Sequence, residues 1–99
     1  MNRFSLRASV KIILSAEVPE PLHLAAQDLA RDIRSAADHI RPDIVSGPAA
    51  SDCIRIAIVP EQFPAGSFEA YHVYSEPGNV LRIDGSDLRG AIYGIYEQS

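Results

Sequence analysis

The feature that most constrains this chain is an apolar stripe lying between two proline-bearing segments. Apolar residues recur in it at spacings of three and four: Leu22, Ala25, Ala26, Leu29, Ile33, Ala36, Ala37 and Ile40. This spacing predicts one long amphipathic helix whose apolar side packs against another layer. Pro21 suits its first turn, and Pro42 stops it near Ile40. A lone helix cannot bury such a stripe, so the rest of the chain must supply a second layer.

Short β-branched runs on both sides of the helix supply that layer. We expect strands at 10–15, 43–46, 53–60, 68–75 and 80–84, the last two joined as a hairpin. A final helix over 88–98 follows, in which Gly90 and Gly94 allow close approach to the sheet. This order predicts an α/β (α+β) two-layer sandwich. Its mixed, mostly antiparallel sheet of about four or five strands would carry two helices on one face.

Length and charge limit what the chain can do. Its 99 residues allow a single small domain, too short for a barrel enzyme of about 250 residues. The net charge of −4, with interspersed charges, disfavours nucleic-acid and anionic-membrane binding. No apolar run is long enough to span a membrane, and none in this sequence matches a secretory signal peptide. The compartment therefore stays open.

Residue types that carry catalysis are present without a pattern. His23 and His39 lie on different sides of the predicted helix and His72 lies on a strand, so we expect no metal site. Cys53 sits in an apolar run and is expected to be a buried thiol. Nothing selects an acid–base pair from the carboxylates flanking the predicted elements, which are Glu17, Glu20, Glu69 and Glu76. The sequence predicts no catalytic, cofactor-binding or metal-binding residue.

The predicted turn at 85–90 lacks the spacing of a nucleophile elbow or a phosphate-binding loop. Ser86 or Asp87 is expected to cap the final helix, with Arg89 on its surface. Contact of this turn with a partner domain or ligand is the alternative. Tyr93 and Tyr96 are neighbours on that helix, because they lie three residues apart. This pair has three alternative interpretations: it packs at an interface, it packs in the core, or it forms a surface on which a sugar stacks.

The block over 81–96, LRIDGSDLRGAIYGIY, is distinctive. With the hairpin before it, the block resembles the N-terminal domain of glycoside hydrolase family 115, the xylan α-glucuronidases. In that family a strand ends in a Gly-Ser-Asp turn. An Arg-Gly step and an Ile-Tyr-Gly-Ile-Tyr helix then lead into the catalytic barrel. The segment DLARDI at 28–33 agrees more loosely with the family's first helix. The chain departs at Leu88, where the family commonly has lysine, so no contact of that lysine is carried over.

The resemblance implies a fold like the second domain of family 20 hexosaminidases. It also implies a supporting role beside a catalytic barrel that holds the family's catalytic acids. We expect residues 1–99 to be a single N-terminal accessory domain cut before that barrel, because the last helix has no C-terminal capping signal. The expected partners are the barrel of the parent chain and polysaccharide. Asp87, Arg89, Tyr93 and Tyr96 are the expected contact residues.

The parent enzyme would remove (4-O-methyl)glucuronic acid from xylan, and the domain would need no cofactor. Two alternatives stay open. A free-standing carbohydrate- or protein-binding module of the same fold fits the small size and the acidic charge. An accessory domain of a hexosaminidase-like glycosidase fits the strand–glycine–helix ending, which related domains share in a shorter form.

Overall fold

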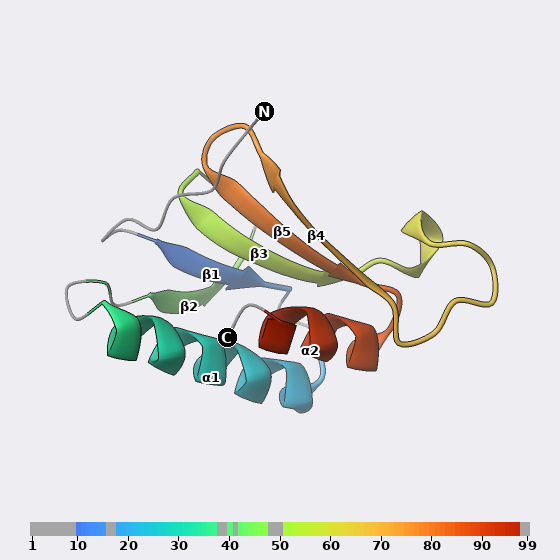
Figure 1. The fold of residues 1–99 in the computed structure, drawn as a ribbon, viewed down its shortest axis with the longest axis horizontal. Coiled ribbons are helices and arrows are strands. Elements are labelled where there is room, and N and C mark those ends of the chain that lie inside the picture. Colours follow the sequence, from blue (N-terminus) through green and yellow to red (C-terminus); the bar gives the residue numbers. More distant parts are fainter. Residues whose placement is uncertain (1–9, 16–17, 38–39, 41, 48–50, 98–99) are drawn as a thin grey trace.

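The computed structural model describes residues 10–15, 18–37, 40, 42–47 and 51–97. They form two layers, a five-stranded sheet and two helices that lie side by side on one of its faces (Figure 1). The elements are β1 (Lys11–Leu14), α1 (Glu20–Ala36), β2 (Asp43–Ser46), β3 (Cys53–Ile58), the 3₁₀ helix η1 (Pro60–Gln62), β4 (Tyr71–Glu76), β5 (Val80–Gly85) and α2 (Leu88–Glu97). The predicted α+β sandwich with a mixed sheet is confirmed, and the predicted hairpin is β4–β5.

The strands follow the order β2-β1-β3-β5-β4, and most of their pairings are parallel. β1 pairs in parallel with β2 and β3, and β3 pairs in parallel with β5. The β4–β5 pairing is antiparallel. The expectation of a mostly antiparallel sheet is therefore wrong. The reason lies in the connections: α1 carries the chain from the end of β1 back to the start of β2, and β4 performs the same return between β3 and β5.

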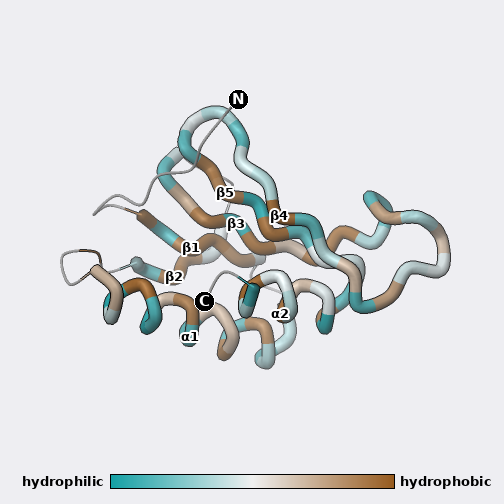
Figure 2. Tube along the Cα trace, viewed as in Figure 1, coloured by the Kyte–Doolittle hydropathy of each residue, from teal (hydrophilic) through white to brown (hydrophobic). Residues whose placement is uncertain are grey.

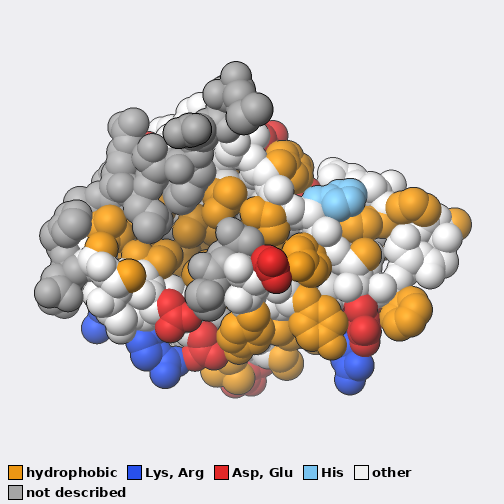
Figure 3. All heavy atoms as spheres, viewed as in Figure 1, with side chains coloured by type: hydrophobic (Ala, Val, Ile, Leu, Met, Phe, Trp, Pro, Cys, Tyr) orange, Lys and Arg blue, Asp and Glu red, His pale blue; other side chains and the backbone are white. Residues whose placement is uncertain are grey.

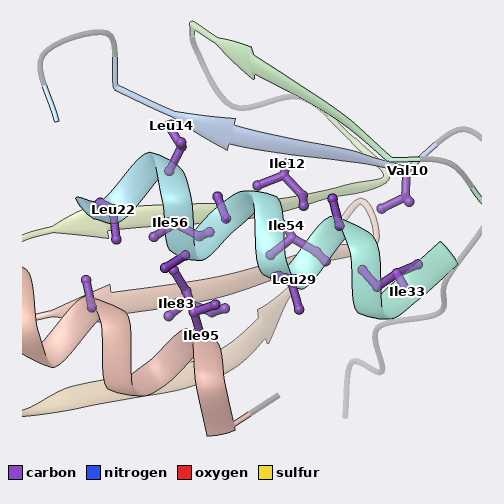
Figure 4. Packing of buried hydrophobic residues seen from close by; sticks show 14 of the residues in the cluster. Val10, Ile12, Leu14, Leu22, Leu29, Ile33, Ile54, Ile56, Ile83 and Ile95 are labelled. Atoms are coloured by element: carbon purple, nitrogen blue, oxygen red, sulfur yellow. The ribbon is translucent and has the colours of Figure 1, made fainter. Parts of the chain in front are cut away.

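The core lies between the sheet and the helices. Alternate residues of β1, β3 and β5 face the helices, and the predicted stripe of α1 meets them (Figure 4). The fully buried side chains there include Ile12, Leu14, Leu22, Ile56, Ile83 and Ile95. Apolar and hydrophilic residues alternate along both helices, as a half-buried helix requires (Figure 2). This packing fixes which side of each helix faces outward.

Helix α1 ends at Ala36, earlier than predicted. Ala37 has an extended backbone (φ −148°, ψ 94°), although its N–H still bonds to the Ile33 carbonyl. Ile40 is buried in the core without belonging to the helix. The stripe thus predicted burial at Ile40 correctly and helix there wrongly. The extended backbone at Ala37 ends the helix, and Ile40 is buried from the segment that follows.

Candidate functional site

The turn between β5 and α2 is held by two side chains that bond to backbone groups. The Asp87 carboxylate accepts the Glu69 N–H at 2.9 Å and the Gly90 N–H at 2.7 Å. The Ser86 hydroxyl accepts the Ala70 N–H at 3.1 Å, and the Ser86 N–H donates to the Ala70 carbonyl at 2.9 Å. The bonds from Glu69 and Gly90 lower the pKa of Asp87. Asp87 is therefore the predicted helix cap, and it also fastens the segment before β4 to the start of α2.

Glu69 has a left-handed backbone, with φ 55°. That conformation costs a non-glycine residue about 1–2 kcal/mol. It is held by the Asp87 bond to its N–H and by an ion pair from Arg89 to its carboxylate at 2.9 Å. Because a left-handed residue cannot continue a strand, β4 begins at Tyr71 and not at the predicted residue 68. The Arg89 side chain remains 72% exposed.

Two glycines bring α2 against the sheet, as predicted. A Cβ on Gly90 would lie 2.0 Å from the Ala70 carbonyl oxygen. A Cβ on Gly94 would lie 2.7 Å from the Cγ2 atom of Ile83 and 3.3 Å from the Cβ of Tyr71. No side chain fits at either position without movement of its neighbours. The opposite side of α2, which carries Arg89, consequently faces outward.

The outer face of the helix layer carries large apolar side chains. Leu24 on α1 is 52% exposed, and Tyr93 and Tyr96 on α2 are 45% and 48% exposed. The Tyr96 hydroxyl donates to the Asp28 carboxylate of α1 at 2.9 Å, and this bond raises the pKa of Tyr96. Figure 3 shows hydrophobic side chains gathered over α2, with charged groups on both sides. We call Leu24, Tyr93 and Tyr96 the helix-face patch.

The four expected contact residues thus have different surroundings. Arg89, Tyr93 and Tyr96 lie on the outer face of α2, whereas the carboxylate of Asp87 is occupied by backbone N–H groups. Core packing does not describe the tyrosine pair, since both rings are about half exposed. Interface packing and sugar stacking both remain compatible with that exposure.

The sheet face away from the helices carries a polar cluster that the sequence pattern does not predict. Asp84 is 1% exposed and accepts bonds from the Tyr74 hydroxyl at 2.8 Å and the Arg82 guanidinium at 3.1 Å. Arg82 also donates to Glu76 at 3.2 Å. Burial, followed by the bond to Asp84, raises the pKa of Tyr74. Alternation along each strand indicates that these residues share a face, but their contacts depend on the β4–β5 register.

His72 and Cys53, whose residue types could serve catalysis or metal binding, make packing contacts. The His72 ring stacks on Phe63, with centroids 4.5 Å apart, and Cys53 is fully buried as predicted. Within the described ranges, no three histidine, cysteine, aspartate or glutamate side chains gather as a metal site. None of the helices in the described part of the chain could span a membrane. The predictions for Glu17 and His39 lie outside the described residues.

Comparison with known proteins gives matches of fold alone. No protein-family model and no curated protein matches the sequence. One similar solved structure is a family GH115 4-O-methyl-α-glucuronidase with specificity for decorated arabinogalactans, at TM-score 0.69 and 19% identity. Another is a GH138 enzyme targeting pectin rhamnogalacturonan II, at TM-score 0.64 and 14% identity. Each match covers 90% of this chain but only 13% or 12% of the enzyme. The chain therefore has a fold that occurs as a small part of two glycoside hydrolases.

Proposed function

We propose that this chain is a non-catalytic domain of a glycoside hydrolase and that it packs on the rest of the enzyme through the helix-face patch and Arg89. The observation that carries the proposal is the pair of structural matches, which cover 90% of this chain and 13% and 12% of the enzymes. A fold that makes up so small a part of a large enzyme suits a supporting domain. Exposed aromatic and arginine side chains are also the types enriched at protein interfaces.

Family 115 is the finer assignment that we favour. The 81–96 block resembles the N-terminal domain of that family, and one matched structure is a family GH115 4-O-methyl-α-glucuronidase. The parent enzyme would release (4-O-methyl)glucuronic acid from a plant polysaccharide. The resemblance suggests xylan, and the matched enzyme suggests decorated arabinogalactan. The match to a GH138 enzyme supports the alternative of an accessory domain from another glycosidase family. The hexosaminidase-like alternative rests on the strand–glycine–helix ending of the sequence alone.

The intact mass of the native polypeptide in its source cells tests the proposal first. A mass far above 10.8 kDa supports it, and a mass of 10.8 kDa contradicts it. The longer polypeptide would then be assayed on glucuronoxylan and on decorated arabinogalactan. The 99-residue chain serves as the control on an aryl glucuronide. We expect turnover by the longer polypeptide alone, whereas turnover by the control would overturn the non-catalytic role.

The second candidate is a free-standing carbohydrate- or protein-binding module. Exposure of Tyr93 and Tyr96 favours it, because an uncovered aromatic pair suits a ligand as well as a neighbouring domain. Tyrosine fluorescence during titration with xylo-oligosaccharides separates the two candidates. A change in tyrosine fluorescence that is lost in Tyr93→Ala supports the binding module. The absence of any change when the native-length polypeptide is titrated counts against the module.

A further inference from the structure

The sheet face away from the helices holds an arginine, Arg55, for which the described residues supply no partner. Arg55 on β3 is partly buried, and within the described part of the chain its guanidinium makes no hydrogen bond or ion pair. It lies directly opposite Arg82 of β5 in the sheet register, so both side chains leave the same face. Asp84 and Glu76 offset the charge of Arg82. Like charges directly opposite each other destabilise a sheet, and Arg55 has no such offset.

Arg55 lines a hollow of about 430 Å³ at the carboxyl ends of the parallel strands β1, β2 and β3. The walls are mostly apolar, and the residues that line it are Ile13, Leu14, Ser15, Ser46, Gly47, Arg55, Ile56 and Ala57. Arg55 is the one charged residue among them. Open sheets bind ligands outside the carboxyl ends of parallel strands, and this volume is typical of small-ligand sites.

A second hollow on the other side of Arg55 differs in charge. Its volume is about 460 Å³, and it is lined by Arg82 and Glu76 as well as Arg55. Glu76 would repel an anion there, and its carboxylate already binds Arg82. Among the described residues, the lining of the first hollow therefore presents the Arg55 guanidinium without a competing carboxylate.

We propose that the first hollow, which we call the Arg55 hollow, binds a small anion through a carboxylate or phosphate group. A guanidinium presents paired N–H donors that match both groups. Ser15 and Ser46 also line the hollow, and no carboxylate is among the lining residues. The Arg55 side chain leaves the sheet face opposite the helices that carry the helix-face patch, so this proposal does not depend on the proposed function.

A heteronuclear NMR titration of the chain tests the site directly. The probes are D-glucuronate, inorganic phosphate and D-glucose. We expect amide shifts at Ile13, Arg55 and Ala57 with the anions and none with glucose. Shifts with both anions show a general oxyanion site, and shifts with glucuronate alone assign it to a sugar acid. The proposal is overturned if neither anion shifts these amides at millimolar concentration.

Variants separate binding at the hollow from general attraction. Arg55→Gln is expected to weaken anion binding by at least about tenfold, because it removes a charge-assisted bond. Ala57→Leu is expected to weaken binding by filling the hollow without changing any charge. Arg34→Gln removes an exposed arginine of α1 that does not line the hollow, so it should bind as the wild type does. An equal loss in Arg34→Gln would overturn the proposal.

The melting temperature of Arg55→Gln separates a binding role of Arg55 from a structural role, because the two roles predict opposite changes. Arg55→Gln removes the like charge opposite Arg82, so its melting temperature should equal or exceed that of the wild type. A clear fall in melting temperature would show that Arg55 stabilises the sheet. In that case Ala57→Leu, which keeps Arg55, would decide the binding question.

Discussion

Among single residues, Asp87 joins two segments with one carboxylate. It accepts the N–H of Gly90 in α2 and the N–H of Glu69 before β4. We expect Asp87→Ala to lower the melting temperature by about 4–8 °C, because a helix cap and a second acceptor are lost together. Asp87→Asn keeps one acceptor oxygen, so its melting temperature should fall less than that of Asp87→Ala. Circular dichroism measures both, with Asp32→Ala on the exposed side of α1 as the control. Melting of Asp87→Ala at the wild-type temperature would contradict this role.

The same contacts fix the sign of a pH dependence. The pKa of Asp87 is lower in the folded chain than its usual value of 3.8. Its contribution to stability is therefore present above pH 3.8 and is lost as the pH falls through the folded pKa. The difference in melting temperature between the wild type and Asp87→Asn should shrink in acid. A difference that stays constant from neutral pH down to about pH 2 would contradict the assignment.

Residue roles could be predicted from the sequence where they act between chain neighbours. A cap such as Asp87 bonds within its own helix turn, and a close approach at Gly90 needs only a missing Cβ. The opposition of Arg55 and Arg82 could not be predicted in this way. It arises when β3 and β5 pair in one particular register, and residues distant in the sequence set that register.

At the scale of whole elements, periodicity predicted the strands and helices but not the direction of pairing. An apolar strand such as β3 has the same alternation beside a parallel or an antiparallel neighbour. Direction follows from the connections, and α1 between β1 and β2 is the return that makes that pair parallel. The same limit applies to the end of α1, because the apolar stripe extends to Ile40 whereas the helix ends at Ala36.

Helix α2 packs closely against the segment before β4, where Gly90 meets the backbone of Ala70. In Gly90→Ala the new Cβ would lie 2.0 Å from the Ala70 carbonyl oxygen, which the Ser86 N–H already holds. We expect the free energy of unfolding to fall by about 3 kcal/mol, since overpacking against backbone exceeds the gain of about 1 kcal/mol in helix propensity. Guanidinium denaturation measures it. Gly66→Ala is the control, because that site is open and adds only left-handed strain of about 1–2 kcal/mol. Equal losses in both variants would contradict tight packing at Gly90.

The molecule as a whole presents different chemistry on its two layers. The helix layer exposes the helix-face patch, whereas the sheet face away from the helices carries Arg55 and the polar cluster around Asp84. A partner domain on the helices would leave the Arg55 hollow uncovered. Docking and anion binding can therefore occur together in one chain, and substitutions on one layer should leave the function of the other unchanged.

A double substitution tests the docking role by its dependence on context. Leu24→Ser with Tyr93→Ser removes exposed side chains, so the chain alone should lose about 1 kcal/mol of stability or less. In the longer polypeptide that the proposed function requires, the same change should cost at least about 2 kcal/mol more, because buried aromatic anchors dominate interfaces. Denaturation of both lengths measures the difference. Gln27→Ser is the control, since Gln27 lies on the flank of α1 toward β2. If the loss is the same at both lengths, the helix-face patch does not dock on the enzyme.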